Sequence, residues 1–357
     1  MQKIKSALLK FYKQPAFTGF VLFIIVLILN LIFEPPSKFF SLNYINSLFV
    51  SNTPFLLVTL GQGILMLAGL LDCSIGMQVA LVNVIYIMTV QEWGIPFWMG
   101  MILGILGAVA ASSVIGALES FVGLPAFLCS YAMTTVIKGV NVLIMPIEQG
   151  KVPKEIYKVY HNPIGGVIPT SAIIFFAVLI VLFFFSKTKF WKHIYAVGGN
   201  RQNAYAAGID ANGIQMKASI LKGVVVGVAG ISLTLMSASG NPIQCEEYGM
   251  RSLAACIMGG MGWGGWGSVA CATFGGWFYV LISNFVYYLF TWLSKIIPGF
   301  QVSSYYNNLA ADVIVFLGLL VTVITIKRQR ESLKQGIKEE LNKLNDTVST
   351  VKGKEDK

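Results

Sequence analysis

The sequence is poor in the side chains that carry out chemistry in water-soluble enzymes. Only two histidines, His161 and His193, and 12% charged residues occur among 357 positions. The five cysteines show no CxxC spacing, which argues against a disulfide framework or a zinc site. A GxxxxGK[ST] phosphate loop is also missing, so the chain itself is not expected to hydrolyse ATP. These absences predict a protein that is not an enzyme and that has no metal or cofactor of its own.

Apolar residues are abundant instead. Hydrophobic residues make up 55% of the sequence and the mean hydropathy is +0.71, values typical of membrane proteins. A bilayer core about 30 Å thick needs roughly 20 apolar residues per helix, which leaves room for about eight to ten spans. The net charge of +10 comes from Lys and Arg that lie mainly at the ends of apolar runs. Membrane orientation explains these charges, and no nucleic-acid partner is expected.

The apolar runs predict an all-α polytopic membrane protein with ten crossings, or eight as the alternative. The predicted spans are 17–33, 54–71, 75–90, 96–119, 126–145, 169–185, 218–236, 251–262, 266–290 and 305–326. The runs 75–90 and 251–262 are short, so each is also compatible with a broken or re-entrant helix.

Three parts are expected along the chain: a basic N-terminus at 1–16, a transmembrane domain at 17–326 with a polar loop at 186–217, and a charged tail at 327–357. The small and polar residues of the loop fit a short helix that lies across the cytoplasmic face. With ten crossings both termini share one side of the membrane. The positive-inside rule makes that side the cytoplasm, although the basic loop around Lys154 argues against this orientation. The tail carries an amphipathic stripe to which we assign no function.

A first interruption of the apolar pattern is the segment GLLDCSIG, where Asp72 and Ser74 precede Gly76. A carboxylate at the membrane centre costs about 2.5 to 3.5 kcal/mol, so Asp72 should face protein, water or a helix end. Two roles are compatible with this position. Asp72 or Ser74 caps the helix that starts near Ile75, or these residues border a translocation pathway.

A second interruption is the glycine-rich segment GGMGWGGWG at 259–267, which includes Gly259, Gly260, Gly264 and Gly265. It matches GxGxxG twice but lies in apolar sequence, so we discard a dinucleotide site. Close helix packing and an unwound turn beside a cavity both remain, and the number of glycines favours the turn. One interruption in each half of the chain is the pattern of transporters built from repeats.

Four further charges lie in or near predicted spans. Glu119 and Lys222 are close enough to span ends for their side chains to reach solvent. Lys138 and Asp312 lie deeper, and we consider that they pair with each other.

Four sequence blocks together resemble the permease subunits of ABC importers for ribose, galactose and related simple sugars, within the branched-chain amino acid/ribose permease superfamily. The blocks are GQGILMLAGLLDCSIG at 61–76, PAFLCSYAMTTVIKGV at 125–140, AVGGN at 196–200 and LAACIMGGMGWGGWGS at 253–268. The resemblance covers about 41–326. The chain departs from the family pattern at Gln202, Asn203, Arg251 and Trp266, which weakens inference about the solute.

The resemblance implies a function and a set of partners. A cytoplasmic ABC ATPase, which holds the ATP and magnesium, binds the polar loop, and an extracytoplasmic protein delivers the solute. A second permease copy or a paralogue completes the path in the bacterial cytoplasmic membrane. The coupling residues implied are Gly198, Gly199, Asn200, Gly208, Ile209, Asn212 and Ile214.

Several cargoes remain open, namely sugars, nucleosides and autoinducer-2. An ion-coupled secondary transporter is the alternative from another class, with Asp72 and Asp312 as ion sites.

Overall fold

The computed structural model describes residues 14–34, 36–262 and 264–297, together with nine positions between 303 and 317. In this part of the chain the regular structure is helical, apart from isolated β-bridges. The elements are α2 (Ala16–Phe33), α3 (Pro36–Phe39), α4 (Leu42–Leu67), α5 (Ile75–Gln91), α6 (Phe97–Ala117), the π-helical turn η1 (Leu118–Val122), α7 (Ala126–Ile144), α8 (Lys154–His161), α9 (Thr170–Phe185), α10 (Lys189–Gly199), α11 (Arg201–Ala206), α12 (Ala211–Ser237), α13 (Tyr248–Met258) and α14 (Val269–Ile296). The predicted all-α class is confirmed for these residues.

Three predicted segments fall wholly or largely outside the described residues. They are the basic N-terminus at 1–16, the tenth span at 305–326 and the charged tail at 327–357 with its amphipathic stripe.

The described residues contain six helices that are long and apolar enough to cross a membrane: α2, α4, α6 with η1, α7, α12 and α14. The pair α9 and α10 makes a seventh candidate, bent by 81° at its break. At 17 residues α5 is shorter than a full span, and α13 has only 11. The ten predicted crossings are therefore not confirmed, and the two short predicted runs are indeed short helices.

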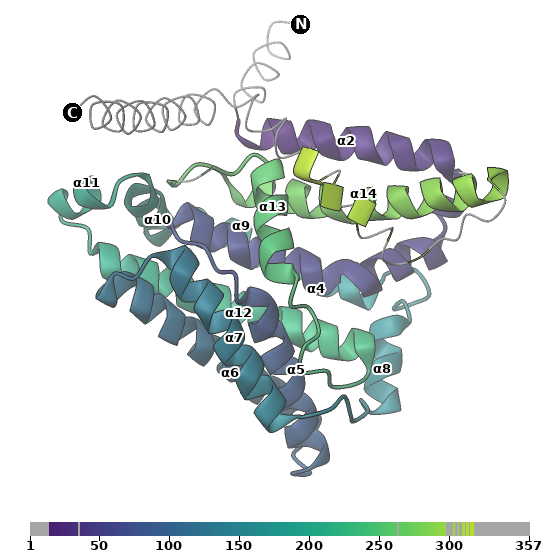
Figure 1. Cartoon of the computed structure of the whole chain (residues 1–357), viewed down its shortest axis with the longest axis horizontal. Helices are drawn as coiled ribbons and strands as arrows, with labels where there is room; N and C mark the ends of the chain where they lie inside the picture. The colour runs from purple at the N-terminus through teal and green to yellow at the C-terminus, as the bar shows by residue number, and fades with distance from the viewer. Residues whose placement is uncertain are drawn as a thin grey trace, which may run out of the picture.

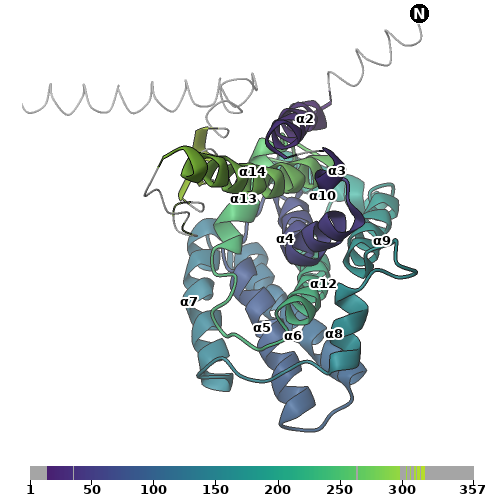
Figure 2. The same cartoon turned by 90° about the vertical axis from the view of Figure 1, so that its right-hand side faces the viewer.

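Two long helices form the centre of the bundle. The most apolar stretch of α4 is 78% buried and that of α12 is 72% buried, whereas the corresponding stretches of α2 and α7 are each 22% buried. Helix α12 packs against α4, α5 and α6, while α14 packs against α2 and α4. In Figures 1 and 2, α2 and α14 run side by side along one edge of the molecule, and α6 and α7 lie toward the opposite edge.

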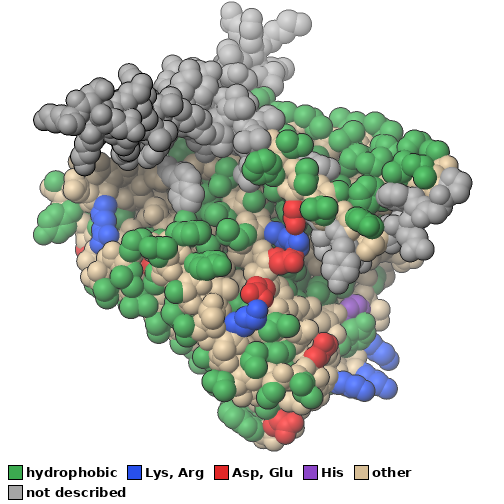
Figure 3. Space-filling model, in the orientation of Figure 1, with side chains coloured by type: hydrophobic (Ala, Val, Ile, Leu, Met, Phe, Trp, Pro, Cys, Tyr) green, Lys and Arg blue, Asp and Glu red, His purple; other side chains and the backbone are tan. Residues whose placement is uncertain are grey.

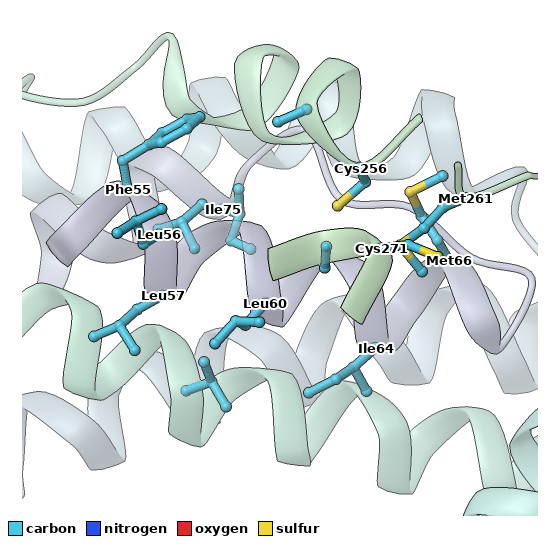
Figure 4. Packing of buried hydrophobic residues seen from close by; sticks show 14 of the residues in the cluster. Phe55, Leu56, Leu57, Leu60, Ile64, Met66, Ile75, Cys256, Met261 and Cys271 are labelled. Carbon is cyan, nitrogen blue, oxygen red and sulfur yellow. The ribbon is translucent and has the colours of Figure 1, made fainter. Parts of the chain in front are cut away.

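The core around α4 is closely packed. Figure 4 shows the sulfur-bearing side chains of Met66, Cys256, Met261 and Cys271 gathered beside one part of α4. Small residues allow the backbones to approach, because a methyl group at Gly275 of α14 would collide with the carbonyl oxygen of Ala255 in α13. Such contacts are typical of helix packing in membranes, where dispersion replaces the hydrophobic effect as the driving force.

Side-chain caps mark the beginnings of the helices in the polar loop at 186–217. The Thr188 hydroxyl accepts a hydrogen bond from the Trp191 amide, Asn200 accepts one from the Asn203 amide, and Asp210 accepts one from the Gly213 amide. Each cap satisfies a free backbone donor of a helix start. The loop is therefore folded into two short helices, α10 and α11, and leads directly into α12.

Candidate translocation and coupling site

The first predicted interruption is a break between α4 and α5. Helix α4 ends at Leu67, and Gly69 adopts φ +79°, a conformation that favours glycine. The amide of Leu70 donates to the Leu65 carbonyl at 2.9 Å, so the helix closes with a left-handed turn. The chain then runs through Asp72 before α5 begins at Ile75.

Asp72 lies at the centre of a buried ion pair. One carboxylate oxygen, Oδ2, lies 2.5 Å from Nζ of Lys222 and accepts a hydrogen bond from Gln78 Nε2 at 2.6 Å. The other oxygen, Oδ1, accepts from the backbone amide of Ser74 at 2.7 Å and from its hydroxyl at 2.5 Å. Asp72 is fully buried and Lys222 is 1% exposed. Every hydrogen-bonding position of the carboxylate therefore has a short, charge-assisted or polar contact.

Gln78 extends this network to a third helix. Its Oε1 accepts from Lys222 Nζ at 3.0 Å and from Ser112 Oγ at 2.7 Å. The network thus joins the start of α5, the middle of α12 and the last turns of α6. Its geometry can hold three helices in register, and no proton or ion is needed to neutralise Asp72.

The position of Lys222 corrects the prediction from sequence. The sequence predicts that this side chain reaches solvent near a span end, because the apolar run starts at 218. Helix α12 in fact begins at Ala211, about two turns before position 218, so Lys222 lies well inside the bundle. The signal that was missed is the polar helical extension from 211 to 217.

The capping role expected for Ser74 is wrong in its simple form. Ser74 is the N-cap of α5, but its hydroxyl accepts a hydrogen bond from the side chain of Gln78 at 2.8 Å and none from a backbone amide of the helix. This hydroxyl donates a hydrogen bond to Asp72 Oδ1, and the same oxygen accepts a second hydrogen bond from the Ser74 backbone amide. Asp72 therefore closes a turn before the helix and binds Lys222 at the same time.

A segment from the second half of the chain packs against this break. After α12 the backbone returns toward Cys245, and a methyl group at Gly76 would collide with the Cys245 carbonyl oxygen. In the same way, a methyl group at Gly249 would collide with the carbonyl oxygen of Cys73. The starts of α5 and α13 are thus in direct backbone contact, and Gly76 permits this contact.

The second interruption is an unwound stretch between Met258 and Val269, as the number of glycines suggested. A methyl group at Gly259 would collide with the Cys271 carbonyl oxygen, and one at Gly260 with that of Pro15. Gly264 and Gly265 lie beside Gly198 and the neighbouring backbone of α10. Gly259, Gly260 and Gly265 therefore make tight backbone packing contacts, and Gly264 and Gly265 are next to the predicted coupling segment.

The predicted coupling residues separate into an outer and an inner group. Gly199, Asn200 and Gly208 are exposed, while Gly198, Ile209 and Asn212 are half-buried and Ile214 is buried. Gly198 packs so closely that a methyl group there would collide with the Leu67 carbonyl oxygen at the end of α4. The polar loop thus touches the first break directly.

A third feature is a group of charges on the surface formed by α7, α13 and the segment before α13. Lys138 pairs with Glu246 at 2.6 Å, and Arg251 pairs with Glu247 at 2.5 Å and with Asp312 at 3.2 Å. Figure 3 shows basic and acidic side chains together near the middle of a face that is otherwise rich in hydrophobic groups. The pairing of Lys138 with Asp312 considered from sequence is therefore wrong, because each has a different partner. We call these five side chains the charged face.

Two cavities open beside the charged face. One of about 430 Å³ is lined by residues that include Arg251, Tyr279 and Asp312, and one of about 520 Å³ is lined by residues 243–248. Both volumes fall within the roughly 300–1,000 Å³ of small-molecule sites. Glu247 lines both, so the two cavities adjoin each other.

The broken helices, the buried ion pair and the folded polar loop define a polytopic membrane transport protein. The particular family follows from comparison with known sequences. Residues 44–324 match the family described as "Branched-chain amino acid transport system / permease component", and the chain belongs to this family. It is a permease subunit of an ABC importer, as the resemblance implied.

The relatives of the chain are permeases. It is 26% identical to the D-allose transport system permease protein AlsC of Escherichia coli (strain K12), over 87% of this chain and 90% of the relative. It is also 26% identical to the autoinducer 2 import system permease protein LsrC of Photorhabdus luminescens, over 74% of this chain and 80% of the relative. A third relative, the inner membrane ABC transporter permease protein YjfF of Escherichia coli (strain K12), is 24% identical over 73% of this chain and 82% of the relative. No solved structure matches the chain significantly.

Proposed function

We propose that the chain moves a small polar solute of the monosaccharide class across the bacterial cytoplasmic membrane, along a path bordered by the charged face. The observation that carries the proposal is the exposure of Lys138, about 39% accessible, within the candidate span α7. A charged side chain at such a position is costly in lipid, so this surface faces water or another protein. A second permease copy or a paralogue encloses the path from the other side.

The chemistry of the charged face fits a neutral, hydroxyl-rich solute. Two basic and three acidic side chains largely neutralise one another and still offer many hydrogen-bond donors and acceptors. Tyr279 and Phe316 add aromatic surface beside Arg251 and Asp312. The name of the D-allose relative supports a monosaccharide as the cargo.

The predicted pathway residues have a supporting place in this proposal. Asp72 and Ser74 are buried in the single chain and hold the break in position, while Gly76 lets the wall segment at Cys245 approach. Gly259, Gly260, Gly264 and Gly265 connect this wall with the polar loop. We therefore assign these seven residues to the wall of the path rather than to contact with the solute.

Coupling to ATP hydrolysis takes place through the polar loop. The exposed helix α11, where Tyr205 is 77% accessible, receives the cytoplasmic ATPase, which carries the ATP and magnesium. Displacement of α10 reaches the end of α4 through the Gly198 contact, and displacement of α12 reaches α5 through Lys222 and Asp72. An extracytoplasmic binding protein delivers the solute on the opposite side, and both termini lie in the cytoplasm.

The ion-coupled alternative needs a carboxylate that is free to bind an ion. Asp72 is already paired with Lys222 at 2.5 Å and Asp312 with Arg251 at 3.2 Å, which favours the ATP-driven function.

Reconstitution tests the proposed function. The chain, its cognate ATPase and its binding protein are placed in liposomes, and the uptake of labelled monosaccharides is followed with and without ATP. We expect uptake that requires all three components and ATP, and that persists when ionophores collapse the proton and sodium gradients. Uptake by the chain alone, driven by a gradient, would contradict the proposal.

A further inference from the structure

A polar cavity separate from the charged face lies between the first break and the polar loop. It measures about 500 Å³ and is lined by residues of three segments: 68–70 after α4, 119–126 at η1 and the start of α7, and 197–202 at α10 and α11, together with Gln215 of α12. The residues of the break and of the loop thus share one polar cavity.

Two buried side chains of this cavity carry oxygen acceptors that lack partners among the described residues. Both carboxylate oxygens of Glu119 have no hydrogen-bond partner among the described residues, and the side chain is 2% exposed. Gln215, 4% exposed, donates to the Ala68 carbonyl through Nε2, but its Oε1 has no partner in the described part of the chain. The prediction that Glu119 reaches solvent near a span end is therefore wrong. A buried carboxylate without a partner is costly unless it is neutralised.

The charged groups around Glu119 do not neutralise it. Its electrostatic neighbours are Asp72 and Lys222, which are already paired with each other. Arg201 also lines the cavity, but its guanidinium donates to the Ser120 carbonyl at 2.8 Å and to Asn212 Oδ1 at 2.5 Å. Glu119 itself lies in the π-helical turn η1, and such turns are frequent at functional sites.

We propose that this cavity binds a single monovalent cationic group, held by the Glu119 carboxylate and the Gln215 amide oxygen. One carboxylate matches one positive charge. A divalent metal is disfavoured, because the described residues contain no group of three or more His, Cys, Asp or Glu side chains that could hold it. The cationic group is either a free inorganic ion or a Lys or Arg side chain of the ATPase, and only the second source rests on the proposed function.

Thermal unfolding of the purified full-length chain in detergent tests the site without any partner. The midpoint is measured in KCl, NaCl, methylammonium chloride and guanidinium chloride at low millimolar concentrations, with N-methyl-D-glucamine chloride keeping the ionic strength constant. We expect a saturable rise of about 3 °C with at least one small cation. A rise with K⁺ or Na⁺ identifies a free ion, and a rise confined to methylammonium or guanidinium identifies a side chain of the partner.

Two variants complete the test. Glu119→Gln should abolish the saturable rise, whereas Glu155→Gln, which changes an exposed carboxylate of α8, should retain it. A wild-type response no larger than that to N-methyl-D-glucamine would overturn the site, even if Glu119→Gln failed to fold. An equal rise in Glu119→Gln would also overturn it. So would a Glu119→Gln variant that is more stable than wild type in every salt, because it would show that no tested cation offsets the cost of burying the carboxylate.

Discussion

At the scale of single residues, the most consequential contact is the ion pair between Asp72 and Lys222. Both side chains are completely buried, so removal from water costs much of what their attraction supplies. Such a pair adds little net stability compared with an apolar pair, but loss of one partner leaves a buried charge uncompensated. We therefore consider the pair to be a positioning element that holds α5 against α12.

This view predicts asymmetric effects of substitution. Asp72→Leu or Lys222→Leu alone should lower the free energy of unfolding by about 3–5 kcal/mol, because one buried charge remains unpaired. The double variant should recover much of that loss while transport stays impaired, because the polar contacts to Ser74 and Gln78 are gone. Thermal unfolding in detergent and solute uptake are the two measurements.

The control for this prediction is Lys138→Leu, which breaks an ion pair whose members are 39% and 45% exposed. It should change the midpoint far less than Lys222→Leu, since exposed pairs contribute at most about 1 kcal/mol. A fully stable Asp72→Leu variant would show that the carboxylate is incidental.

At the scale of secondary-structure elements, the polar loop is a relay of two short helices. Helix α10 ends at Gly199, and the residue before it, Gly198, contacts the end of α4. Helix α11 is largely exposed to solvent. A methyl group at Gly198 would collide with the Leu67 carbonyl oxygen, whereas one at Gly199 would meet nothing within 4 Å among the described atoms. Two adjacent glycines thus differ sharply in what they contact.

Gly198→Ala and Gly199→Ala form a matched pair of variants. Gly198→Ala should push α10 away from α4, at a cost of about 1–3 kcal/mol, and weaken the stimulation of ATPase activity by substrate. Gly199→Ala should behave like wild type. The ATPase activity of the reconstituted complex, with and without loaded binding protein, measures the effect. Equal stimulation in the two variants would exclude a relay through Gly198.

The turn after α11 supports a second prediction for this loop. Gly208 has φ +79°, is exposed, and has open space around it. Gly208→Trp should leave membrane insertion intact but abolish the stimulation of ATPase activity by substrate, because the large ring obstructs docking of the ATPase. Gly208→Asn, a residue that tolerates this backbone conformation, is the control and should retain coupling. Normal transport by the Trp variant would refute the assignment of the loop.

At the scale of the whole molecule, the charged face distinguishes one side of the bundle from surfaces where large hydrophobic side chains are exposed. In α7, Lys138 pairs with Glu246 on this face, while Val136, two residues earlier and 54% exposed, lies roughly opposite on the helix. If the charged face borders an aqueous path, the two positions should differ in their access to water.

Cysteine labelling tests this difference. Lys138→Cys in the assembled transporter should react with a charged, membrane-impermeant thiol reagent at least about tenfold faster than Val136→Cys, because the thiolate forms readily in water but not in lipid. The rate is measured in membrane vesicles, against a background variant with the five native cysteines replaced. Similar slow rates at both positions would place Lys138 away from water and argue against the proposed path.

The parts of the site that the sequence predicts correctly are single continuous segments of the chain. The interruption at Asp72 and the glycine-rich turn each appear as a departure from an apolar pattern within about ten residues, and the polar loop appears as one over 186–217. Each is an irregular or folded segment in the structure. The ten predicted crossings are not confirmed in the described part of the chain, because an apolar run does not reveal whether its helix is long enough to cross. At 17 and 11 residues, α5 and α13 show this limit.

Sequence alone determined the membrane environment, the helical class and the two interruptions, because these properties depend on composition and local periodicity. Tertiary structure decided which charges meet: Lys222 reaches Asp72 across 150 positions, Lys138 reaches Glu246, and Glu119 stays buried beside a polar cavity. The reason is that charge partners in a helical bundle are chosen by which helix faces pack together and by where each helix begins. Neither is visible in the order of residues along a single run.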